Sequence, residues 1–193
     1  MTSHTTGKTA LYLALAIVTL GVAVGGARAA TNSSISTGQG HFLKKVAEHG
    51  MAEVEMAKLA REKAVRDEVR QFAERMVADH TKANDEVTAL AMSNGVKLPD
   101  GPDKKHAKEK DKLAKLTGPD FDREYMRRML KDHKEDVKDF RKEAKAKHPN
   151  DVNAFAAKTL PVLEEHLRMA QVTYDIAATG KRTGERETGS TKK

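Results

Sequence analysis

The stretch Met76–His80, with the sequence Met-Val-Ala-Asp-His, places an acid–histidine pair in the middle of a long run whose apolar residues recur every three or four positions. That spacing is typical of an amphipathic helix. The pair returns as Asp-His at 132–133 and as Glu-His at 165–166, and a fourth run has Glu53 at the corresponding place. The sequence therefore predicts an all-α fold in which four helices each bring one polar residue to the same level of a shared core.

The boundaries of these helices can be predicted from capping residues. Asp67 and Asp120 are predicted N-caps because short acidic side chains accept hydrogen bonds from the first free backbone N–H groups. Gly95 and Gly180 are predicted to end two of the helices, and Pro161 should kink the last helix or begin a second segment. We expect helices at 41–64, 67–94, 121–147 and 152–179.

A long connection joins the second and third predicted helices. Its first part, 97–103, is rich in proline, glycine and aspartate, and 104–116 has the composition of a short exposed helix. At ~1.5 Å per helical residue and ~3.3 Å per extended residue, the connection could reach roughly 60 Å, whereas a 25-residue helix is only about 38 Å long. It can therefore cross the bundle as in ferritin-like proteins, but an up-and-down arrangement stays open.

The two ends of the chain differ in composition from the helical region. Lys8, an apolar run at 10–24 and Ala-Arg-Ala at 27–29 are typical of a signal peptide. An uncleaved anchor is the alternative, although a span needs roughly 20 apolar residues. We predict a signal peptide at 1–29, a flexible linker at 30–40, the bundle at 41–180 and a disordered basic tail at 181–193. The protein would then be exported to the periplasm or cell envelope, with no transmembrane span after cleavage.

Composition limits the chemistry that the protein can perform. The chain has no cysteine, which excludes disulfides and thiolate metal ligands. A metal site must use histidine, carboxylate or backbone oxygen, and such donors suit iron, manganese or zinc. The sequence contains no phosphate loop, nucleotide fingerprint or nucleophile elbow, so we expect no nucleotide cofactor.

The net charge of +7 is concentrated in two lysine-rich segments, 104–115 and 181–193. The simplest interpretation is that these lysines are solvated. Alternatively they bind anionic envelope components. Because no aromatic residues lie between the basic ones, we expect no specific binding of nucleic acid. The sequence leaves a homo-oligomer open.

The level of the four polar residues follows from counting along the two predicted hairpins. Glu53 and His80 lie at nearly equal distances from the break near Arg66, and His133 and His166 do so from the break at 148–151. We therefore predict that these four residues are metal ligands at one level of the core. A single inward histidine is usually a hydrogen-bonded core residue, so purely structural or pH-responsive histidines remain the alternative.

Four further residues are weaker candidates for the metal site. His49 lies one helical turn from Glu53 and could be an additional ligand. Asp79, Asp132 and Glu165 could be terminal ligands or could hold the histidine rings as acceptors. In the alternative interpretation these three acids face solvent beside neighbouring lysine or arginine residues.

Several short motifs also resemble a known family. They are Phe42-Leu43, Gly50-Met51-Ala52-Glu53-Val54, Val69-Arg70-Gln71-Phe72-Ala73, Met76–His80, Phe121-Asp122-Arg123-Glu124-Tyr125, Asp132-His133 and Leu160-Pro161 with His166-Leu167. Over about 41–178 the chain resembles the exported bacterial ferritin-like proteins of the domain of unknown function 4142 family, some of which are labelled outer-membrane proteins. The resemblance implies a ferritin-like four-helix fold and export, and it implies no established activity.

The chain departs from di-iron ferritins, which carry Glu-x-x-His pairs. Here Val77, Leu130 and Leu163 precede the core histidines by three residues, which favours a histidine-rich mononuclear site and places ferroxidase activity in doubt. We expect an exported protein that binds metal in an envelope stress or metal-handling role; as an enzyme it would be a metal-dependent oxidoreductase. The alternative is a non-enzymatic envelope protein that binds anionic surfaces.

Overall fold

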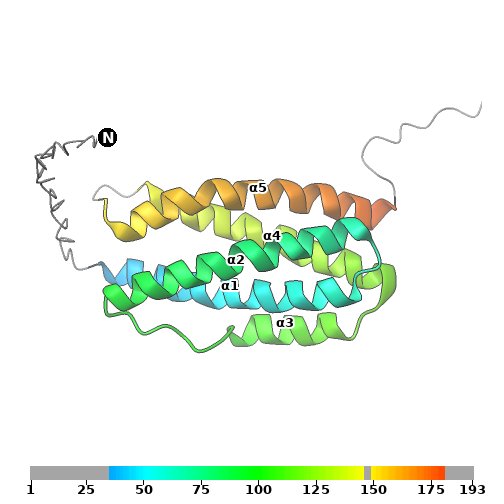
Figure 1. Cartoon of the computed structure of the whole chain (residues 1–193), viewed down its shortest axis with the longest axis horizontal. Helices are drawn as coiled ribbons and strands as arrows, with labels where there is room; N and C mark the ends of the chain where they lie inside the picture. Colours follow the sequence, from blue (N-terminus) through cyan, green and yellow to red (C-terminus); the bar gives the residue numbers. More distant parts are fainter. Residues whose placement is uncertain (1–34, 146–148, 181–193) are drawn as a thin grey trace, which may run out of the picture. The chain divides into compact units, whose positions relative to one another are not determined.

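Five helices form the part of the chain that the computed structural model describes, residues 35–145 and 149–180 (Figure 1). No strand occurs in these residues, so the predicted all-α architecture is confirmed. The predicted signal peptide, residues 30–34 of the predicted linker and the basic tail lie outside the described residues. The helices are α1 (Thr37–Lys63), α2 (Asp67–Ser93), α3 (Lys104–Ala114), α4 (Gly118–Ala144) and α5 (Asp151–Thr179).

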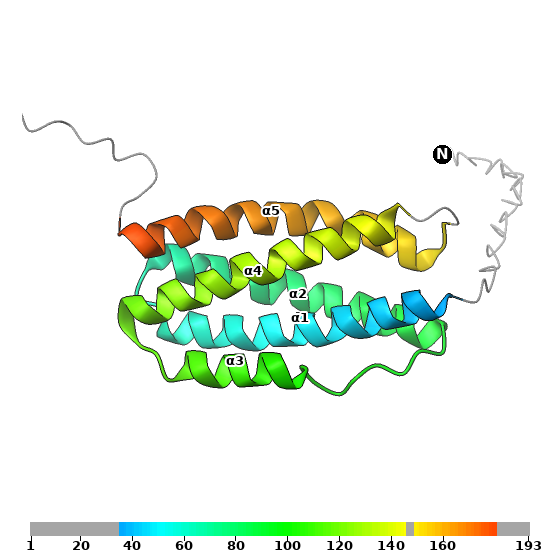
Figure 2. The ribbon, with the colours of Figure 1, turned by 180° about the vertical axis from the view of Figure 1, so that it is seen from behind.

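The helices are arranged as two antiparallel hairpins, α1–α2 and α4–α5, joined by a crossover. Helix α2 packs against α5, and α1 packs against α4. The connection that contains α3 returns along the bundle, so α2 and α4 run in the same direction (Figures 1 and 2). The long connection therefore does cross the bundle, as in ferritin-like folds.

Capping boxes start the first and last helices. The Ser36 side chain accepts from the backbone N–H of Gln39, and the Gln39 side chain accepts in return from the Ser36 N–H. Helix α1 therefore begins at Thr37, four positions before the predicted start, and the linker predicted at 30–40 is wrong at its C-terminal end. Asn150 and Asn153 form the corresponding box of α5, and Gly180 ends that helix at φ 73°.

The predicted caps of the two middle helices are wrong. The N-caps of α2 and α4 are Arg66 and Thr117, and neither uses its side chain to cap. Asp122 of α4 instead reaches the turn between α1 and α2. Its carboxylate accepts from the backbone N–H groups of Val65 at 3.2 Å and Arg66 at 3.0 Å. The start of α2 is thus held by a residue distant in sequence.

Helix α3 lies against α1 and α4, as Figures 1 and 2 show. The helix predicted to be exposed is exposed on its outer face, but its His106 and Leu113 are buried against the bundle. Asp103 caps the helix through the backbone N–H of His106, and Lys110 forms a 2.6 Å ion pair with Glu55 of α1. These contacts fix α3 to the bundle.

Helix α5 continues through Pro161 as one helix, so the alternative of a separate segment is wrong. The core that the long helices share consists of two apolar clusters. One contains Phe72, Met76, Phe121 and Met129; the other includes Leu43, Val87, Phe140 and Leu163. A layer of buried charged and polar side chains belongs to neither cluster, and it contains Glu53, His80, Asp132, His133, Asp136 and His166.

Replacing Asp122 with alanine should destabilise the protein by roughly 3 kcal/mol, because two backbone donors lose a charged acceptor. Asp120→Ala is the matched control, since Asp120 is exposed and pairs with Arg123 at the surface; its loss should cost under about 1 kcal/mol. Urea unfolding followed by circular dichroism measures both. Equal losses in the two variants would contradict the capping role of Asp122.

Candidate metal centre

Three histidines from three helices meet inside the bundle. His80 of α2, His133 of α4 and His166 of α5 are 6%, 0% and 1% exposed. Each pair of rings has its centroids 5.4 Å apart, and one ring nitrogen of each residue lies within 4.8 Å of the other two. Three imidazoles at this spacing are close enough to share one ion after a small adjustment of the side chains.

An oxygen atom holds the other nitrogen of each ring. Nδ1 of His80 lies 2.9 Å from Oε2 of Glu53, and Nδ1 of His133 lies 2.9 Å from the carbonyl oxygen of Met129. Nε2 of His166 lies 2.8 Å from Oδ2 of Asp79. Carbonyl and carboxylate oxygens only accept hydrogen bonds, so these three nitrogens carry the protons. The second nitrogen of each ring is then free to bind a cation.

Two of the free nitrogens face each other. Nε2 of His80 lies 3.4 Å from Nε2 of His133. Nδ1 of His166 is buried and has no hydrogen-bond partner among the described residues. Two imidazole lone pairs repel at this distance unless a cation lies between them, either a proton on one ring or a metal ion.

Glu53 contributes the negative charge at the centre of this cluster. It is 2% exposed, and its Oε1 lies 3.3 Å from Nδ1 of His133. Burial raises the pKa of Glu53. The neighbouring His80 and His133 lower it by more than burial raises it, so the pKa of Glu53 is about 2. The structure thus brings Glu53 to the three histidines, at the ring edges that carry Nδ1 of His80 and His133.

His80 and His166 differ in their electrostatic surroundings. Burial lowers the pKa of His80, but the charge and hydrogen bond of Glu53 outweigh burial and raise it. Burial together with His80 and His133 lowers the pKa of His166 to about 4. His166 is therefore neutral near pH 7, which is the form that binds metals.

The four weaker candidates for the metal site lie in different surroundings. Asp79 accepts from His166 and also pairs with exposed Arg75. Glu165 pairs with Arg168 at the surface and forms no hydrogen bond to a histidine within the described part of the chain. His49 bonds to Asp136 of α4 at 3.0 Å instead of joining the three histidines. Asp132 is buried, and burial together with Glu53 raises its pKa to about 6.

Sequence reasoning missed two buried residues of this region, Asp136 and His106. Asp136 lies one turn after His133 on the same helix, so the helical period could have indicated it. His106 lies among lysines on α3, and no local pattern distinguishes it from a solvated residue. Only the packing of α3 against α1 and α4 buries it.

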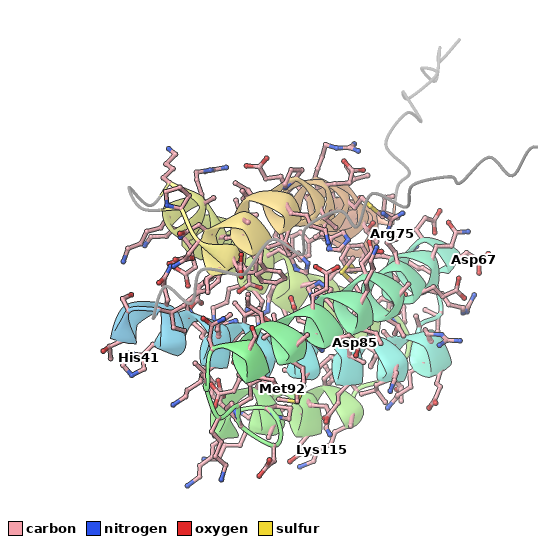
Figure 3. The ribbon with its side chains drawn as sticks, turned by 60° about the vertical axis from the view of Figure 1, so that its left-hand side comes forward. His41, Asp67, Arg75, Asp85, Met92 and Lys115 are labelled. Atoms are coloured by element: carbon pink, nitrogen blue, oxygen red, sulfur yellow. The ribbon has the colours of Figure 1, made fainter. Side chains whose placement is uncertain are left out.

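A cleft of about 280 Å³ leads to the cluster. Residues of α2 and α5 line its outer part, including Arg75, Lys82 and Lys158, while Glu53 and His166 lie among its inner residues. Arg75 projects from α2 on the side toward α5 (Figure 3). The cleft gives an ion or small ligand a route to the buried histidines.

Fold and site together define a ferritin-like four-helix protein with a buried histidine cluster. The chain belongs to the family described as domain of unknown function DUF4142, whose family model matches residues 25–173. This match confirms the predicted family. The comparison with curated proteins finds no match.

Two solved structures have a similar fold. A DUF305 fragment from Deinococcus radiodurans has a TM-score of 0.64 and 16% identity, covering 72% of this chain and 97% of its own. A DUF305 protein from Streptomyces coelicolor, described as a candidate secreted protein, has a TM-score of 0.60 and 17% identity, covering 76% and 94%. At such identities the likeness concerns the fold. Among the described residues no helix has the length and apolarity that a membrane span requires.

Replacing Glu53 with alanine should destabilise the protein by roughly 3–5 kcal/mol, because a buried charged pair loses one partner. Glu55→Ala is the matched control on the same helix, since Glu55 pairs with Lys110 near the surface and should contribute about 1 kcal/mol or less. Urea unfolding at pH 7 compares the two variants. A Glu53→Ala loss no larger than that of Glu55→Ala would contradict the central role of the Glu53–His80 contact.

Proposed function

We propose that this protein binds one divalent transition-metal ion through His80, His133 and His166, in a metal-handling or stress-protective role in the cell envelope. The observation that carries the proposal is the orientation of the three rings. Each ring donates one N–H to an oxygen, and one ring nitrogen of each lies within 4.8 Å of a ring nitrogen of the other two. Oxygen acceptors of this kind orient histidine ligands in metal sites and raise their basicity.

The donor set favours iron, manganese or zinc. Three imidazoles with an open fourth position are typical of catalytic zinc sites, and imidazole also suits iron. Glu53 and Asp79 would supply negative charge next to the ion while holding His80 and His166 in place. The cleft would let a water molecule or small ligand reach the open position, and a redox-active ion there would supply oxidoreductase chemistry.

An exported location supports this role. The first 29 residues have the pattern of a signal peptide, and a structurally similar Streptomyces coelicolor protein is described as a candidate secreted protein. Outside the cytoplasm a metal site without thiolates is not exposed to cysteine oxidation, and the chain has no cysteine.

The metal content of the untagged protein tests the proposal. We expect about one iron, manganese or zinc ion per chain through this site, and its loss in the His80→Ala, His133→Ala double variant. His41→Ala is the matched control, because His41 is exposed at the start of α1 and should leave metal content unchanged. A chelator should lower the unfolding midpoint of the wild type by more than that of the double variant, since ligand binding adds about 3 kcal/mol at 100-fold excess over Kd.

A protonated histidine pair is the competing explanation for the 3.4 Å contact between His80 and His133. It predicts that metal content is the same in the double variant and the wild type. It also predicts that the chelator changes the unfolding midpoint of the wild type no more than that of the double variant. Either result would overturn metal binding at the three histidines.

The outer face of α3 supports a second candidate function, which is binding to anionic surfaces. Its lysines at 104, 105, 108 and 112, together with Lys115 just after the helix, are exposed, while Lys110 is paired with Glu55. A row of unpaired cations on one helix attracts anionic lipid or polysaccharide, and salt screens that attraction.

Replacing these five exposed lysines with glutamine should reduce retention on phosphatidylglycerol vesicles at low salt. Wild-type retention should fall steeply as salt rises to about 0.5 M, because the Debye length shortens to a few ångströms. Glutamines at Lys131, Lys134 and Lys138, which are exposed on α4, are the matched control. Retention that does not depend on salt would reject this candidate.

A further inference from the structure

A second group of buried histidines and acids lies where α3 packs against α1 and α4. His106 of α3 is 3% exposed and His49 of α1 is 7% exposed. Their ring centroids are 4.6 Å apart in an edge-to-face arrangement. None of the three histidines of the proposed metal site, His80, His133 and His166, takes part in this group.

Carboxylates hold one nitrogen of each of these rings. Nδ1 of His106 lies 2.8 Å from Oδ2 of Asp103, and Nδ1 of His49 lies 3.0 Å from Oδ1 of Asp136. Ionised carboxylates accept hydrogen bonds and cannot donate them. Nε2 of each ring is therefore available for another contact.

Asp132 of α4 supplies a buried acid without a hydrogen-bond partner. It is 3% exposed, and its Oδ2 has no partner among the described residues. A ligand atom of His106, a carboxylate oxygen of Glu109 and a carboxylate oxygen of Asp132 all lie within 4.8 Å of one another. A buried carboxylate oxygen without a partner is costly unless a cation compensates for it.

We infer that His106, Glu109 and Asp132 form a second divalent-cation site, separate from the three histidines. Ligand atoms about 2.1 Å from an ion are at most about 4.2 Å apart, so a small inward rotation of these side chains is sufficient. One imidazole and two carboxylates form a harder donor set than three imidazoles, and this set suits manganese or zinc.

The site would attach the crossover helix to the bundle. His106 and Glu109 are three positions apart and lie on one face of α3, while Asp132 belongs to α4. Glu109 also pairs with Arg128 of α4 at 3.1 Å, which directs its carboxylate toward the same helix. An ion between these groups would join α3 to α4 through metal–ligand bonds, in addition to the packing of their side chains.

This inference is tested by titrating the chelator-treated full-length protein with Zn²⁺. Isothermal titration calorimetry monitors the binding, and elemental analysis counts the bound zinc. We expect two equivalents in the wild type. His106→Ala and Asp132→Asn should each remove one equivalent and leave the other. His80→Ala with His133→Ala should remove the other equivalent and retain the one at α3.

Asp132→Asn keeps the side-chain shape, so it also tests the site without relying on α3 packing. In metal-free protein this variant should unfold at the same temperature as the wild type or higher, because it removes a buried charge without a partner. Its gain in unfolding temperature on adding Zn²⁺ should be smaller than that of the wild type. His41→Ala should behave as the wild type does.

The outcomes separate the two sites. Unchanged stoichiometry in both His106→Ala and Asp132→Asn would overturn the α3 site. A wild type that binds one equivalent, lost only in the variants of His106 and Asp132, would support the α3 site and overturn binding at the three histidines. One equivalent lost only in the variant of His80 and His133 would overturn the α3 site alone.

Discussion

The structure depends on placing one carboxylate, Glu53, in the middle of a helical core. A buried carboxylate is costly unless it is paired, and Glu53 finds its partner in His80, with His133 close by. These contacts are satisfied only when α1, α2 and α4 are aligned at one level. The same requirement orders α5, because His166 must lie against the other two imidazoles and reach Asp79. The polar layer therefore determines which turns of the four helices face one another.

Such a layer is not the most stable way to fill a bundle. Replacing buried ion pairs with well-packed apolar side chains is often neutral or stabilising, and apolar clusters of the usual kind occupy the core outside this layer. The polar residues interrupt the core at a height where leucine would pack. Their presence in a core of this kind is easier to explain by ligand binding than by stability, and the cleft that reaches His80 and His166 is consistent with that explanation.

The sequence predicted the parts of the structure that depend on local periodicity. Helical spacing and counting from the breaks placed Glu53, His80, His133 and His166 in one region, which is where the structure places them. The helix α2 starts where it was predicted, but its cap could not be predicted in this way, because Asp122 accepts from the turn before α2 although it lies more than fifty positions away. His106 was missed for the same reason, since its burial depends on the crossover bringing α3 against α1 and α4. Residues that act through distant packing leave no periodic signal.

The apolar residues next to the histidines explain the direction in which the polar layer extends. Val77, Leu130 and Leu163, three positions before the core histidines, pack with the two apolar clusters. At those positions a carboxylate-bridged ferritin would carry glutamate, so a pair of metal ions along the bundle axis lacks its bridging acids here. The buried acids of α4 near the histidines are Asp132 and Asp136 instead, and they lie on the side toward α1 and α3. The polar layer thus spreads sideways, from the centre of the bundle to the crossover helix. Helix α3 therefore contributes a residue, His106, to the polar layer. In an up-and-down bundle no helix would cover that side.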